Sequence, residues 1–199
     1  MLKLFSRMWE RIESGRSDSD MTLFTYLMYG CELTAKLCVL GMVSTIGDDR
    51  DRLRYSQIHR LVRADGLGDW ATTLEESLVG PPNQFLRESA RVEQRELLQK
   101  HGPGAWQFTA VENMFHCVRL IDSGIEELPN KVDAKRWVNL FCRLRNKTRG
   151  HGAPNPETLS KMCPLLESSL RTFSGESVSY THLRAHETDS YLVCRLLLE

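Results

Sequence analysis

Residues 145–151, with the sequence RNKTRGH, combine a phosphate-binding side chain with a general acid–base side chain. Histidine exchanges a proton near neutral pH, so His151 can take the proton from a ribose 2′-hydroxyl or protonate a leaving 5′-oxygen. Arginine binds a phosphate through two parallel N–H bonds and stabilises the charge that develops on it, which suits Arg145 to the scissile phosphate. Glycines on both sides of His151 leave the backbone open to a substrate. The segment therefore predicts RNA cleavage without a metal ion.

This segment ends a strongly basic stretch, residues 131–151. Its charged residues are Lys131, Lys135, Arg136, Arg143, Arg145, Lys147 and Arg149, against the single acid Asp133. In a chain with 26 basic and 26 acidic residues, this local excess indicates an anion-binding surface. We expect Arg143, Lys147 and Arg149 to bind the phosphates of an RNA. The competing interpretation is that these bases only complement the dipole at a helix C-terminus, with Gly150 as its cap.

Other candidate residues have weaker chemical cases. Glu32 is an acid in a long apolar segment, and it could hold Arg145 or another base of the site; a purely structural ion pair is the commoner role for such a residue. His116 and Cys117 are adjacent, but neighbouring helix residues point in different directions. His59 is expected at the surface. The aromatic residues Trp106, Trp137 and Phe141 are expected in the core rather than on a base-stacking surface.

The elements that must position the site are helices. Apolar residues recur every three or four positions, and no strand alternation or hairpin signal interrupts them. Helices are expected over residues 2–12, 21–46, 50–64, 70–78, 85–100, 104–122, 132–148 and 156–173. The last of these has Asn155 as N-cap and Pro156 at its first position. The fold class is therefore all-α, a helical bundle with additional short helices.

The arrangement of Arg145, Asn146 and, after five intervening residues, His151 resembles the signature of the HEPN superfamily. That signature is an arginine, often followed by a polar residue, and a histidine after a short spacer. The resemblance would cover most of residues 20–175, and it implies a helical bundle that dimerises and joins two such motifs in one cleft. It implies a metal-independent endoribonuclease of toxin–antitoxin, phage-defence or RNA-processing systems. Arg145 and His151 would then be catalytic and Asn146 would support them. No tyrosine follows His151 closely, which argues against some toxin subgroups.

Two other functions remain open at this point. The first is a catalytically inactive helical sensor or interaction domain, placed before a C-terminal effector such as an NTPase or kinase. The second is a nucleotide-binding module that uses the same basic loop. The expected partners of the leading hypothesis are RNA, a second copy of the chain, and an antitoxin or fused effector domain. No metal or other cofactor is expected, because the sequence offers no carboxylate cluster or paired-cysteine motif.

Cysteine usage and hydropathy favour a cytoplasmic protein. Residues 1–177 contain five scattered cysteines, Cys31, Cys38, Cys117, Cys142 and Cys163, which indicates reduced thiols rather than a disulfide framework. The first residues carry charges throughout, unlike a signal peptide. No uninterrupted apolar run reaches about 18 residues, so no membrane span is expected.

Residues 178–199 resemble the translation of sequencing-library DNA rather than protein. Residues 178–188, VSYTHLRAHET, match a transposase end joined to an adapter, and residues 191–198, YLVCRLLL, match the fixed adapter part after a variable index. Such segments are set aside before fold analysis, and His182, His186 and Cys194 with them. We therefore expect three parts: a short helix and link over 1–19, a HEPN-like domain over 20–177, and a non-native tail. We also expect the chain to be a fragment of a longer protein.

Overall fold

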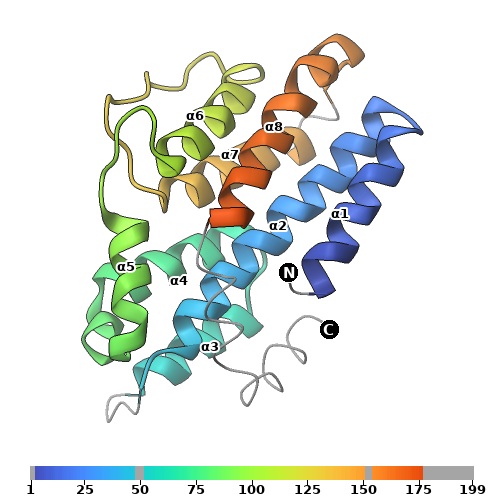
Figure 1. The fold of residues 1–199 in the computed structure, drawn as a ribbon. Coiled ribbons are helices and arrows are strands. Elements are labelled where there is room, and N and C mark those ends of the chain that lie inside the picture. The colour runs from blue at the N-terminus through green and yellow to red at the C-terminus, as the bar shows by residue number, and fades with distance from the viewer. Residues whose placement is uncertain (1–2, 48–51, 151–153, 177–199) are drawn as a thin grey trace.

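The computed structural model describes residues 3–47, 52–150 and 154–176, and Figure 1 shows their arrangement. The elements are α1 (Lys3–Arg16), α2 (Asp20–Ser44), α3 (Leu53–Val62), α4 (Leu67–Val79), the 3₁₀ helices η1 (Pro81–Phe85) and η2 (Glu88–Ala90), α5 (Arg91–Leu98), α6 (Trp106–Arg119), α7 (Arg136–Gly150) and α8 (Pro156–Glu176). Extended pairing among the described residues is limited to two isolated bridges. The predicted all-α fold is confirmed, and the expected tail over 178–199 lies outside the described residues.

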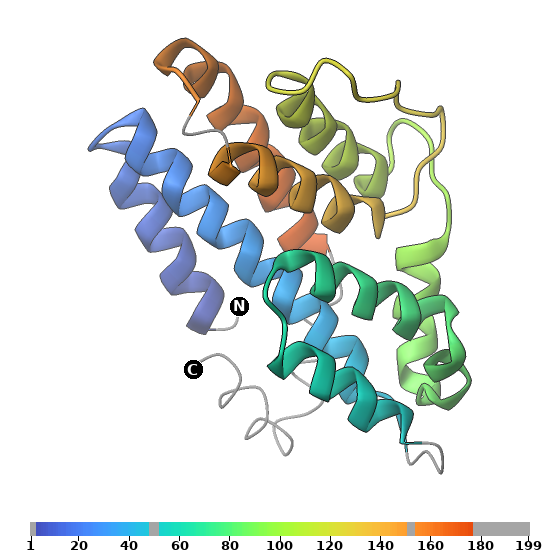
Figure 2. The same cartoon turned by 180° about the vertical axis from the view of Figure 1, so that it is seen from behind.

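Helix α2 is the central element of the bundle. It packs against α1, α3, α4, α7 and α8, and Figures 1 and 2 show α1 running antiparallel beside its N-terminal half. By length and composition alone α2 could cross a membrane, but 67% of its most apolar window is buried inside the protein, as in a core helix. Ser19 caps the helix, since its Oγ accepts a hydrogen bond from the backbone N–H of Thr22 at 3.1 Å.

The close crossing of α1 and α2 depends on Gly30. A Cβ atom at this position would lie 2.8 Å from Cδ2 of Leu170 on α8 and 3.3 Å from Cδ1 of Ile12 on α1. Leu170 and Ile12 are fully buried, so a larger residue at position 30 would have to displace their packed side chains. Gly30 therefore allows three helices to meet at one point.

An aromatic cluster joins α6, α7 and α8. The rings of Trp137 on α7 and Phe173 on α8 stack with centroids 4.2 Å apart, and the ring of Phe141 stacks with that of Trp137 at 5.8 Å. The indole Nε1 of Trp137 donates a hydrogen bond to Oγ of Ser169 at 2.8 Å, and this hydroxyl donates to the carbonyl oxygen of Ala110 on α6 at 2.7 Å. A buried serine thus satisfies the one polar atom of the tryptophan.

Two expected helix boundaries are wrong because the backbone at these positions pairs with distant segments of the chain. The helix expected over 85–100 is reduced to α5, because the backbone before it pairs with the end of α2: Gly47 N–H donates to Phe85 C=O at 2.7 Å and Arg87 N–H to Thr45 C=O at 2.9 Å. The helix expected from residue 132 begins at Arg136, because Val132 exchanges two backbone hydrogen bonds with His101.

The expected start of the last helix is confirmed. Oδ1 of Asn155 accepts a hydrogen bond from the N–H of Thr158 at 2.8 Å, and Pro156 is the first helical residue. The five cysteines outside the tail, Cys31, Cys38, Cys117, Cys142 and Cys163, are all buried and free.

The serine in the aromatic cluster provides a test of the packing. Ser169→Ala leaves the buried indole N–H of Trp137 without its acceptor, so we expect the free energy of unfolding to fall by about 1–3 kcal/mol. Ser160→Ala is the matched control, because Ser160 is exposed on the same helix and should change stability little. Urea denaturation measures both variants. Equal stabilities for the two would contradict this account of the cluster.

Candidate functional site

Arg145 lies on α7 and reaches across to α2. Its Nε donates a hydrogen bond to Oε2 of Glu32 at 3.1 Å, and the two side chains are only 16% and 19% exposed. Glu32 is the only hydrogen-bond acceptor of this guanidinium among the residues that the structure describes. The contact between Glu32 and Arg145 considered from the sequence is therefore present. The hydrogen bond to Glu32 is made by Nε rather than by a terminal nitrogen of the guanidinium.

Glu32 is shared between two cations. Its other oxygen, Oε1, lies 2.9 Å from Nζ of Lys36 one turn further along α2, and that ammonium lies over the ring of Trp70 at 5.3 Å. Burial opposes ionisation of the Glu32 carboxyl, but the hydrogen bonds and charges of Lys36 and Arg145 outweigh it and hold its pKa below the usual value. The carboxylate is thus ionised at neutral pH and fixes the orientation of Arg145.

A small pocket of about 170 Å³ opens beside this ion pair. It is lined by Met21, Phe24, Thr25, Met28, Tyr29 and Glu32 of α2 and by Arg145 and Thr148 of α7. Thr25, Tyr29, Glu32 and Lys36 are spaced by four, three and four residues, so they share one face of α2. That face is polar, whereas most of α2 is buried. The pocket thus places polar side chains of α2 beside the guanidinium of Arg145.

Other bases of the predicted cluster also have acidic partners. Nζ of Lys135 lies 2.7 Å from Oε1 of Glu75, which belongs to α4. Oδ2 of Asp122, after the end of α6, accepts a hydrogen bond from Arg143 at 2.8 Å and lies 3.5 Å from Nζ of Lys147. The Arg143 guanidinium holds the pKa of Asp122 below its usual range. The surface is therefore less positive than the sequence of residues 131–151 alone indicates.

The remaining predicted site residues are only partly described. Asn146 follows Arg145 on α7 and is exposed. Helix α7 extends through Gly150 rather than ending at 148, so Arg145 lies before the last helical turn and not in it. His151 lies outside the described residues, and so does the side chain of Arg149.

The weaker candidates are core or surface residues. Cys117 is fully buried, and burial raises the pKa of its thiol far above the usual value, while His116 is exposed and packs against Phe115. They form no cysteine–histidine pair. His59 is exposed and stacks on Tyr55. The aromatic residues expected in the core, Trp137 and Phe141, are fully buried, and Trp106 packs against them through Phe173. Over the described ranges, no three His, Cys, Asp or Glu side chains are grouped to hold a metal ion.

A second group of candidate residues, which we did not expect from the sequence, lies near Arg145. Arg7 and Arg11 of α1 line a larger pocket together with Tyr29, which also borders the Arg145 pocket. Their spacing of four residues on an amphipathic helix, and the position of Tyr29 outside the buried face of α2, are the signals that could have identified them.

Comparison of the chain with protein-family models, with curated proteins and with solved structures found no match.

The low pKa of Glu32 predicts a pH dependence of stability. Because the pKa is lowered in the folded state, the stabilisation is complete above the unfolded value near 4.5 and is lost as pH falls through the lower folded value. At pH 7, Glu32→Gln should reduce the free energy of unfolding by about 1–3 kcal/mol, since one partner of a half-buried charged contact is neutralised. The difference between wild type and variant should shrink below about pH 4.

Urea denaturation at several pH values measures this difference. Glu157→Gln is the control, because Glu157 forms an exposed pair with Lys161 one helical turn away and should change stability much less. A difference between wild type and Glu32→Gln that stays constant from pH 7 down to pH 3 would contradict the role of the charge.

Proposed function

We propose that this chain is a HEPN-like, metal-independent endoribonuclease domain in which Arg145 and His151 are catalytic. One observation carries the proposal: the guanidinium of Arg145 lines a pocket, and Glu32 of another helix orients it through Nε. The terminal edge of such a guanidinium matches two oxygens of a phosphate. His151 follows α7 directly in the sequence and supplies the acid–base group.

The proposed reaction is a transesterification at phosphorus. His151 accepts the proton of the ribose 2′-hydroxyl, the 2′-oxygen forms a bond to phosphorus, and the bond to the 5′-oxygen breaks. Arg145 stabilises the negative charge that builds up on the phosphate oxygens. In a homodimer with two motifs in one cleft, the second His151 gives the leaving 5′-oxygen its proton. The products are a 2′,3′-cyclic phosphate and a 5′-hydroxyl.

The neighbouring residues have secondary roles in this proposal. Asn146 is exposed beside Arg145 and supports substrate binding. Arg143, Lys147 and Arg149 bind the RNA backbone, the first two by exchanging Asp122 for phosphate. The five reduced, buried cysteines are compatible with a cytoplasmic protein. We infer a defence, toxin–antitoxin or RNA-processing role, with an antitoxin or a fused effector as partner.

A second candidate function is a catalytically inactive helical interaction domain. The observation that favours it is the pairing of four cations from the basic stretch, Lys135, Arg143, Arg145 and Lys147, with acids of other elements. Basic residues that are paired with acids of the same chain can stabilise the fold without binding RNA. This candidate predicts a folded chain that cleaves no RNA.

The two candidates are separated by RNA cleavage in EDTA. His151→Ala and Arg145→Ala should each lower the rate by about 100-fold or more, because one removes the acid–base group and the other the charge-stabilising group. His59→Ala and Arg119→Ala are matched controls, since both residues are exposed and lie outside the site. Unchanged cleavage in the two site variants would refute the catalytic assignment. Absence of cleavage by the folded wild-type chain would favour the inactive domain.

A further inference from the structure

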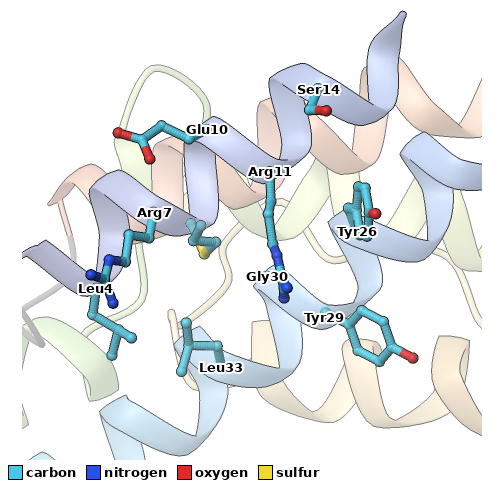
Figure 3. A pocket seen from close by; sticks show the side chains of 10 residues that line it. Leu4, Arg7, Glu10, Arg11, Ser14, Tyr26, Tyr29, Gly30 and Leu33 are labelled. Atoms are coloured by element: carbon cyan, nitrogen blue, oxygen red, sulfur yellow. The ribbon is translucent and has the colours of Figure 1, made fainter. Parts of the chain in front are cut away.

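A pocket of about 640 Å³ lies between α1 and α2, and Figure 3 shows it at close range. The residues that line it are Leu4, Arg7, Met8, Glu10, Arg11 and Ser14 of α1 and Tyr26, Tyr29, Gly30 and Leu33 of α2. Its volume lies within the range of about 300–1,000 Å³ that is typical of small-ligand sites. It is larger than the pocket beside Arg145 and separate from the residues singled out by the sequence motif.

Two arginines give this pocket a positive side. Arg7 and Arg11 lie one turn apart on α1 and are exposed, and neither forms a hydrogen bond or ion pair with any residue in the described part of the chain. Like charges at this spacing repel each other, so a bound anion would relieve their repulsion. Figure 3 shows Arg11 extending from α1 toward Gly30 of α2, while the carboxylate of Glu10 points away from α2.

Tyr29 links this pocket to the Arg145 pocket. Its side chain lines both, and it is 56% exposed on a helix whose other large apolar residues are mostly buried. Figure 3 places its ring at the edge of the α1–α2 pocket, on the side to which Arg11 extends. A molecule that filled the α1–α2 pocket would therefore lie next to a group bound at Arg145.

We propose that the α1–α2 pocket binds single-stranded RNA next to the scissile phosphate, with one base stacked on Tyr29 and two further backbone phosphates held by Arg7 and Arg11. The inference rests on the proposed function, because the neighbouring phosphate is the one assigned to Arg145. An exposed aromatic ring accepts the face of any base, and arginines follow the backbone charge. A paired duplex hides its base faces, so single-stranded RNA is the form that fits.

The test is binding of a fluorescein-labelled 12-nucleotide oligouridine, 2′-O-methylated so that it cannot be cleaved, measured by fluorescence anisotropy with the full chain in EDTA. Tyr29→Leu should raise the Kd by about 10-fold through loss of stacking. Arg7→Gln combined with Arg11→Gln should lower the slope of log K against log salt by about 1.4, the value for two phosphate contacts on a single strand.

The chain offers matched controls for both changes. Tyr55→Leu removes a tyrosine that is 65% exposed on α3, and Arg63→Gln with Arg87→Gln removes two exposed arginines far from the pocket in sequence and on other segments. The controls should leave the Kd within about 2-fold of wild type after the general loss of charge is allowed for. Equal effects of the pocket variants and their controls would overturn the proposal.

Two further outcomes have defined meanings. If Tyr29→Leu abolishes self-association in analytical ultracentrifugation and leaves RNA binding unchanged, a second copy of the chain covers this face and the proposal is wrong. If RNA binding depends on Tyr29, Arg7 and Arg11 but no RNA is cleaved, the nucleotide site stands while the nuclease function fails. If RNA is cleaved but the Kd does not depend on these three residues, the nuclease function stands and the proposed nucleotide site is wrong.

Discussion

The burial of α2 is the constraint on which the rest of the structure depends. This 25-residue helix has few polar positions, and its apolar surface must be covered on several sides at once. Helices α1, α3, α4, α7 and α8 provide that cover. Burying an apolar side chain contributes about 1.5–3 kcal/mol to the free energy of unfolding. Because α2 has many buried residues, its burial contributes a large share of the stability of the fold. The face of α2 that carries Thr25, Tyr29, Glu32 and Lys36 is less buried than the rest.

The candidate site follows from that less buried face. Glu32 is placed where α7 crosses α2, and a carboxylate so little exposed requires compensating cations. Lys36 and Arg145 supply them, and the helix that provides Arg145 leads directly to residue 151. The same face presents Tyr29 between two pockets. Core packing, the orientation of an arginine and the exposure of an aromatic ring therefore have one common cause, which is the way α2 is covered.

Local sequence patterns predicted the helices, whereas the contacts around Glu32 and Asp122 depend on residues far apart in the sequence. The helical periodicity and the Asn155–Pro156 start were visible because they depend on neighbouring residues. The break before α5 was not, because it depends on pairing of Phe85 and Arg87 with the end of α2 some forty residues earlier. The sequence marked Glu32 as an unusual acid, but which bases it contacts depends on how α7 packs against α2. The pairing of Asp122 with Arg143 and Lys147 was missed for the same reason.

In the proposed reaction, Arg145 and His151 cleave RNA by transfer of the phosphate to the adjacent 2′-oxygen. This reaction can be tested by mass spectrometry of the fragment ends produced from a defined single-stranded RNA in EDTA. We expect 2′,3′-cyclic phosphates on the upstream fragments and 5′-hydroxyls on the downstream fragments, because in the proposed reaction the 2′-oxygen is the nucleophile and His151 is its base. Fragments that end in 3′-hydroxyls and begin with 5′-phosphates would contradict it, since water would then be the nucleophile.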